Sequence, residues 1–147
     1  CKQGGSVIAS GAYIASDFWD TDKPLDDDQK FANEVLKYKW RVGRAAVEGK
    51  VKTVQSPFAS FTGKYQFYTK LNSDFYAVES PDALEPVGNN AYTIFRYSEN
   101  NLSAGIAYQG DYKTCILGFP LETIKEEPLR DQLFQNILSF IFTTDNK

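Results

Sequence analysis

The last third of the chain has the pattern that most constrains its fold. Three short apolar segments, 92–98, 102–109 and 112–119, are separated by turn residues. Asn100-Asn101 fits a turn because Asn tolerates the left-handed backbone region. Gly110-Asp111 fits a two-residue hairpin turn, with positive φ at the glycine. These segments therefore predict an antiparallel meander of three strands.

A helix is predicted directly after this meander. Pro128 suits its first turn, where a missing backbone N–H leaves no partner unsatisfied. Apolar side chains then recur at helical spacing, which predicts that one face of the helix packs on the sheet. They are Leu129, Leu133, Ile137 and Ile141, flanked by Phe134, Leu138 and Phe140.

The first third predicts one strand and one helix. Segment 6–15 is apolar and does not alternate, which is typical of a buried strand in a parallel sheet. It breaks at Ser16-Asp17. Acidic residues at 26–28 suit the start of a helix, which we expect to end at 41–43. The apolar side chains at helical spacing in this stretch are Phe31, Val35 and Tyr38.

The middle of the chain gives weaker patterns. We expect strands within 44–55, 65–71 and 75–78, and loops at 80–82, at Pro86 and at 88–90. Aromatic side chains crowd this region, where they form either a core or a surface that stacks on sugar rings. The sequence as a whole predicts one α/β domain over 1–147 with a mixed sheet.

Composition excludes several classes of function. Apolar residues make up 42% and charged residues 24%, which is typical of a globular domain. No apolar run reaches the ~18–20 residues that a membrane-spanning helix needs. The net charge of −3 argues against a nucleic-acid partner. His is absent, so no Cys-His or Ser-His triad exists within this chain.

Three stretches together resemble a known family. They are Gly4-Gly5-Ser6-Val7-Ile8-Ala9-Ser10-Gly11, the segment 80–88, and Gly118-Phe119-Pro120-Leu121-Glu122. Over most of the chain they resemble the C-terminal region of bacterial secreted proteins labelled xanthan lyase. The resemblance implies a secreted, periplasmic or cell-surface location. It also implies polysaccharide, or other domains of the same protein, as partners. Because the chain contains no Met, we expect it to be a piece of a longer chain, and the resemblance implies that it is the C-terminal part.

The overall pattern also resembles class I glutamine amidotransferase-like domains, which are three-layer α/β/α folds of flavodoxin-like type. That family has a Phe-His-Pro-Glu motif before its final helix. Here Pro120 stands at the His position and Glu122 at the Glu position. The nearest candidate for the family's nucleophile turn is Ser10-Gly11-Ala12-Tyr13, which has no Cys. The resemblance thus implies a non-catalytic accessory or scaffolding domain without a cofactor.

A ligand is expected beyond the carboxyl ends of the strands, where open α/β sheets bind. The residues that follow such ends predict a vestigial pocket, with Gly11 allowing close approach of a ligand. They are Ser10, Gly11, Tyr13, Asp17 and Glu122. Arg96 lies near tyrosines and Glu99, with Lys113 as a possible neighbour, and it suits a sugar carboxylate. The structural alternative is that these residues cap helices and form surface ion pairs.

An enzyme is the alternative function. A polysaccharide lyase or glycoside hydrolase would use Tyr and a pair of carboxylates, for which Asp17 and Glu122 are the candidates. No metal-ligand spacing, P-loop or dinucleotide motif is present, so we expect no metal. Cys115 is expected as a buried thiol rather than a disulfide partner of Cys1. Cys1 itself is either a lipid attachment site or an ordinary residue.

Overall fold

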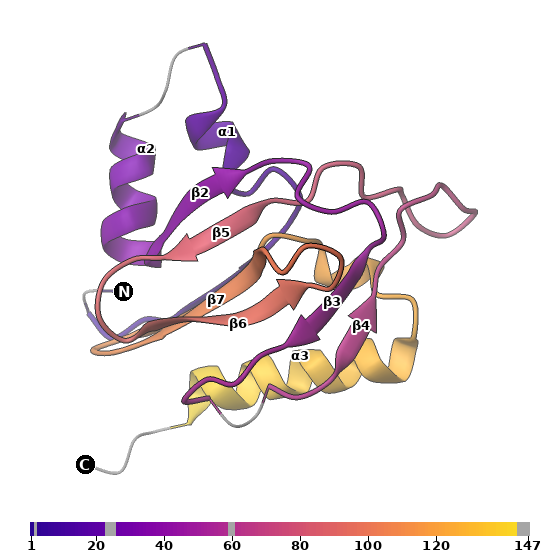
Figure 1. The fold of residues 1–147 in the computed structure, drawn as a ribbon. Helices are drawn as coiled ribbons and strands as arrows, with labels where there is room; N and C mark the ends of the chain where they lie inside the picture. Colours follow the sequence, from indigo (N-terminus) through magenta and orange to yellow (C-terminus); the bar gives the residue numbers. More distant parts are fainter. Residues whose placement is uncertain (2, 23–25, 59–60, 144–147) are drawn as a thin grey trace.

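A curled, mixed sheet of six strands is the centre of the protein in the computed structural model, which describes residues 1, 3–22, 26–58 and 61–143 (Figure 1). The strand order is β1-β8-β7-β6-β3-β4. β1 is parallel to β8, and the other neighbouring pairs are antiparallel. The strands are β1 (Val7–Ser10), β3 (Lys50–Thr53), β4 (Lys64–Gln66), β6 (Ala91–Tyr97), β7 (Ser103–Gln109) and β8 (Lys113–Leu117). The fold is therefore α/β, as the sequence predicts.

A second sheet of two strands and a set of helices complete the fold. β2 (Tyr38–Val42) pairs antiparallel with β5 (Ala83–Pro86). The helices are α1 (Ser16–Trp19), α2 (Asp26–Phe31), the π-helical η1 (Ala32–Leu36), the 3₁₀-helical η2 (Leu121–Thr123) and α3 (Glu127–Phe142). In Figure 1, α3 lies along one side of the main sheet, and α1, α2 and the small sheet lie on the other.

The predicted meander is confirmed as β6, β7 and β8. Asn101 has a φ of +63°, as its turn position requires. The hairpin turn differs from the prediction, because Gln109 pairs with Lys113 and three residues lie between them. Gly110 does not have positive φ. A Cβ at residue 110 would instead collide with the hydroxyl of Tyr108, so that this side chain would have to move.

The C-terminal helix is also confirmed, with a narrower buried face than predicted. Pro128 lies in the first turn of α3. Leu133, Ile137 and Phe140 are buried, whereas Leu129 and Phe134 are exposed. The helix thus packs on the sheet through one narrow stripe.

The predicted helix that begins at residue 26 ends earlier than expected. α2 continues into η1 and stops at Leu36, because Lys37 adopts a left-handed conformation with a φ of +68°. Tyr38–Val42 is strand β2 instead. Tyr38 is buried and its hydroxyl donates to the carbonyl of Ile14, while Lys39 is exposed. Buried and exposed side chains alternate here, as they do in a strand. The helical spacing of Phe31, Val35 and Tyr38 therefore does not extend the helix to Tyr38.

The middle of the chain contains two further corrections. Segment 75–78 is not a strand; Val78 N–H instead donates to the carbonyl of Tyr68. Residues 83–86, of which only Pro86 is expected in a loop, form β5. The sequence does not reveal β5, because its pairing is not local. Its partner, β2, lies more than forty residues earlier in the chain.

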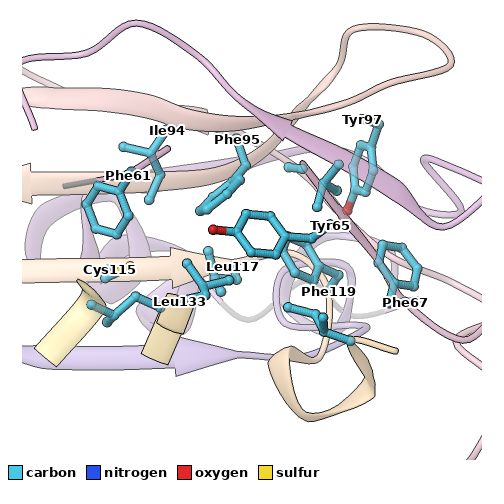
Figure 2. Close-up of a cluster of buried hydrophobic side chains, with 14 of the residues drawn as sticks. Phe61, Tyr65, Phe67, Ile94, Phe95, Tyr97, Cys115, Leu117, Phe119 and Leu133 are labelled. Atoms are coloured by element: carbon cyan, nitrogen blue, oxygen red, sulfur yellow. The ribbon is translucent and has the colours of Figure 1, made fainter. Parts of the chain in front are cut away.

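Two hydrophobic clusters lie on the two faces of the main sheet. Cys115 and Leu117 of β8 face the cluster that contains α3, and Ile116 faces the cluster that contains η1 and β2. Figure 2 shows the aromatic part of the first cluster, where the rings of Phe67 and Phe119 stack with centroids 5.3 Å apart. The middle aromatics Phe58, Phe61, Tyr65 and Phe67 are buried, so for them the core interpretation is correct.

The two cysteines are free, so the thiol prediction is confirmed. Cys115 is fully buried, and this burial raises the pKa of its thiol to about 12. Among the described residues, no helix has both the length and the apolarity needed to cross a membrane.

One junction connects β5 with the main sheet. The Asp82 N–H donates to the carbonyl of Gly118 (2.8 Å), and the Tyr97 hydroxyl donates to the carbonyl of Asp82 (2.7 Å). Gly118 N–H in turn donates to the Ala104 carbonyl (2.8 Å). The backbones approach so closely that a Cβ on Gly118 would collide with the carbonyl oxygen of Asp82. A glycine is therefore required at residue 118 by packing.

We expect Gly118→Ala to lower the free energy of unfolding by about 2–3 kcal/mol, because neither backbone can move without loss of these hydrogen bonds. Urea denaturation followed by tryptophan fluorescence measures this change. Gly5→Ala is the control, since Gly5 is exposed and a Cβ there would meet only the Cys1 nitrogen, at 3.6 Å. Equal unfolding midpoints for the two variants would contradict the packing argument.

Candidate functional site

A hollow of about 410 Å³ opens where the chain leaves β1 and enters α1, opposite the end of β2. Tyr13, Ser16, Asp17 and Asp20 come from the β1–α1 side of the hollow. Ser80 comes from the segment before β5. The remaining lining residues belong to β2 and the loop after it: Trp40, Val42, Gly43 and Arg44. The hollow therefore combines aromatic rings, hydroxyls, two carboxylates and one guanidinium group.

Two residues that line the hollow have backbone conformations that are rare for their type. Tyr13 has a φ of +61° and Arg44 a φ of +48°. Bulky residues seldom adopt positive φ, and such conformations concentrate at functional sites. Tyr13 also leaves 47% of its surface exposed. Its ring therefore lies at the opening of the hollow, and the positive φ of its backbone costs conformational energy.

Asp82 lies beneath the hollow and is fully buried. Its Oδ2 atom accepts the N–H groups of Ala15 (2.8 Å) and Ser16 (2.9 Å) and the Ser16 hydroxyl (3.2 Å). These donors bind the carboxylate to the start of α1. Its other oxygen, Oδ1, is buried and has no hydrogen-bond partner. Burial raises the pKa of Asp82, while the hydrogen bonds from Ser16 and Ala15 oppose this rise.

Trp40 contributes a second unsatisfied group to the same place. Its Nε1 atom is buried and has no well-aligned hydrogen-bond partner. The indole N–H nevertheless lies near enough to Asp82 to lower the pKa of that carboxyl. The Tyr38 phenol is close as well, since burial and the charge of Asp82 both raise its pKa. The Trp40 N–H and the Asp82 carboxyl thus lie near each other behind the hollow without a well-aligned hydrogen bond.

The structure brings only some of the sequence-predicted ligand residues into this hollow. Tyr13 and Asp17 line it. Ser10 Oγ instead accepts the N–H of Leu121 (3.2 Å), and Gly11 N–H donates to the Leu117 carbonyl (3.2 Å). Ser10 and Gly11 therefore connect the end of β1 to β8 and η2.

Glu122 follows Leu121 and lies outside the lining of the hollow. Its carboxylate accepts the hydroxyl of Tyr76 (2.8 Å) at the surface. Partial burial of the half-exposed Tyr76 raises its pKa to about 12, and the hydrogen bond and the charge of Glu122 add to the rise. Asp17 and Glu122, the acid pair of the enzyme alternative, thus do not share this hollow.

The contacts of Arg96, Glu99 and Lys113 are with different parts of the chain. Arg96 Nη1 donates to the carbonyl of Asn101 (2.8 Å). The Glu99 carboxylate accepts the N–H groups of residues 47 and 48 at 2.7 and 3.0 Å. Lys113 Nζ donates to the carbonyls of residues 140 and 143 at the end of α3. Each of these side chains has a structural contact, and a ligand role for Arg96 stays a prediction.

Sequence reasoning missed most of this site. Ser80-Pro81-Asp82 has the residue types of a turn, and Trp40 falls within the helical spacing of the preceding segment. The one signal for Asp82 is its place directly before the apolar pair Ala83-Leu84, which is unusual for a solvated acid. Among the residues that the structure describes, no group of three or more Cys, Asp or Glu side chains is placed to hold a metal ion.

Comparisons of this chain with protein-family models, with curated proteins and with solved structures give no match.

The buried Asp82 predicts an unusual pH dependence. Because its pKa is raised in the folded protein, its contribution to stability is fully present below pH ~3.8 and is lost as the pH rises through the folded-state pKa. We expect the stability of the wild type, relative to Asp82→Asn, to fall as the pH rises from 3.8 through the raised pKa. Each unit of pKa difference changes the free energy of unfolding by about 1.4 kcal/mol. Urea denaturation across this range measures it, and a relative gain in stability at neutral pH would contradict it.

The contact between Tyr76 and Glu122 gives a second titration test. Glu122→Gln removes the negative charge, so we expect the pKa of Tyr76 to fall from about 12 toward 10.0. NMR detection of the tyrosine ring carbons follows each phenol separately. The pKa of Tyr112, which is raised by burial and by Tyr108 and Asp111, serves as the internal control. An unchanged Tyr76 titration would show that burial alone sets its pKa.

Proposed function

We propose that this chain is a non-catalytic accessory domain that binds a carbohydrate chain at the hollow, within a secreted or surface protein that handles polysaccharide. The observation that supports binding is the exposed Tyr13 ring, held at positive φ beside Trp40 and several hydrogen-bonding side chains. Aromatic faces next to polar groups suit a sugar, which has an apolar face and a rim of hydroxyls.

The proposal includes a three-layer, amidotransferase-like arrangement of the fold. Its support is the placement of hydrophobic clusters on both faces of the main sheet, one under α3 and one under η1 and β2. The β7–β8 hairpin leads through Phe119 and Pro120 into η2 and α3, which is the chain order of that family's final segment. The absence of His and of an elbow Cys supports the loss of the amidotransferase reaction.

A binding role agrees better with the carboxylates than hydrolysis does. A glycosidase places two carboxyl groups about 5–10 Å apart across the scissile bond, one of them with a raised pKa. The acid with the raised pKa is Asp82, and three donors already hold one of its oxygens. Asp17 and Asp20 line the hollow, whereas Glu122 is held by Tyr76 elsewhere. We therefore favour recognition over catalysis.

The test is binding of the purified chain to a panel of neutral, amino and acidic oligosaccharides, measured by NMR titration. We expect Tyr13→Ala to weaken binding at least ~tenfold, as loss of a central aromatic contact does. Tyr76→Ala is the matched control, because Tyr76 is 49% exposed against 47% for Tyr13 and lies outside the hollow. Absence of binding across the whole panel would overturn the proposed function, and so would release of reducing ends from any member.

A further inference from the structure

Three cationic side chains lie in a row across β6, β3 and β4 of the main sheet (Figure 1). Lys52 of β3 is directly opposite Arg96 of β6 and also directly opposite Lys64 of β4. We name these three residues the cation row. Neighbouring strands are about 4.8 Å apart, so the row spans roughly 10 Å.

The cation row lies on the face of the sheet that is turned away from α3. Each member is next in sequence to a residue that is buried in the cluster containing α3, namely Val51, Tyr65 or Tyr97. Successive side chains of a strand point to opposite faces, so the three cations point away from that cluster. Lys64 is exposed, and Lys52 and Arg96 are half-buried.

The cation row is an unfavourable arrangement without a compensating acid. Like charges directly opposite each other on neighbouring strands destabilise a sheet. Among the residues that the structure describes, no ion pair includes a member of the row, although acids outnumber bases by 19 to 16 in the whole chain. Arg96 donates one hydrogen bond to the carbonyl of Asn101 and has further N–H groups to donate.

The acids near the row have other contacts. Glu48 pairs with Lys50 (3.2 Å), and Glu99 accepts the N–H groups of residues 47 and 48. Glu126 and Lys64 both line a pocket of about 210 Å³, but they do not form an ion pair. The cation row therefore keeps its positive charge within a chain whose net charge is −3.

Protection of the sheet edge explains only part of the row. Lysine on an edge strand hinders unwanted pairing with another chain, and this accounts for Lys64 on β4. It does not account for Lys52, because β3 lies inside the sheet between β6 and β4.

We propose that the cation row binds the carboxylates of a linear acidic polysaccharide, a polyuronate. That the ligand is a carbohydrate rests on the proposed function, whereas its acidity follows from the row. A carboxylate accepts charge-assisted hydrogen bonds from ammonium and guanidinium groups and offsets the repulsion between them. Because the row spans roughly 10 Å, a chain of uronates contacts it at more than one point, and linked contacts strengthen binding. The hollow is a separate site, since no member of the row lines it.

The experiment is an NMR titration of the backbone amides with oligogalacturonate and with a neutral gluco-oligosaccharide of the same length, at low salt. We expect only the uronate to shift the amides of β3, β4 and β6. Lys52→Glu is expected to weaken uronate binding at least ~tenfold, because an attractive contact becomes a repulsive one. Lys39→Glu is the matched control, since Lys39 is an exposed strand residue outside the row and its replacement changes the net charge equally.

Urea denaturation of the same variants without ligand separates binding from a role in the fold. Lys52→Glu places an acid between two cations, so we expect its unfolding midpoint to equal or exceed that of the wild type. A lower midpoint would show that Lys52 serves the fold and would overturn the inference. Lys64→Glu, at an exposed position of the edge strand, is a second variant that is expected to weaken uronate binding.

Other outcomes distinguish this inference from the proposed function. Uronate binding that is absent, that is confined to the hollow, or that Lys52→Glu and Lys64→Glu leave unchanged would overturn the inference and leave the proposed function standing. An inorganic polyphosphate or an oligonucleotide that binds the row as tightly would overturn the assignment to a uronate. Failure of the whole oligosaccharide panel to bind would overturn the proposed function as well.

Discussion

The buried residue Asp82 connects three parts of the protein that are distant in sequence. Its N–H and carbonyl bind Gly118 and Tyr97 of the main sheet, and its carboxylate binds the start of α1. β5 of the small sheet begins at the next residue. Burying a carboxylate is costly unless donors surround it, and three donors on Oδ2 offset that cost. The backbone of Asp82 thus joins β5 to the main sheet, and its side chain holds the start of α1 beside them.

The same contacts determine the shape of the hollow. Because Oδ2 holds Ser16, the first turn of α1 is fixed beside the segment that carries Ser80. Ser80 in turn accepts the N–H of Arg44, which positions the loop after β2. The lining thus comes from three segments that are brought together around one carboxylate. Trp40 of β2 approaches the same carboxyl, since its indole lowers the pKa of Asp82.

The sequence predicts those parts of the fold whose contacts are local. The meander and α3 follow from turn residues and from one apolar stripe, because neighbouring strands pair across short turns. β2 and β5 are different, since Tyr38 and Pro86 pair across nearly fifty residues and each strand taken alone resembles a helix end or a loop. The site is missed for the same reason. Tyr13 and Asp17 follow a strand end and are predictable, whereas Trp40, Gly43 and Asp82 join them only through tertiary contacts.

The distribution of unfavourable interactions supports the candidate hollow better than the distribution of acids does. Glu122 and Arg96, the candidates that sequence favoured, have conventional hydrogen-bond partners. Around the hollow, Tyr13 and Arg44 carry positive φ, and Asp82 Oδ1 lies buried without a donor. Proteins violate local rules of stability mainly where function requires it. Tyr13 and Arg44 line the hollow together and Asp82 lies behind it, and this concentration of costs supports the proposed binding role.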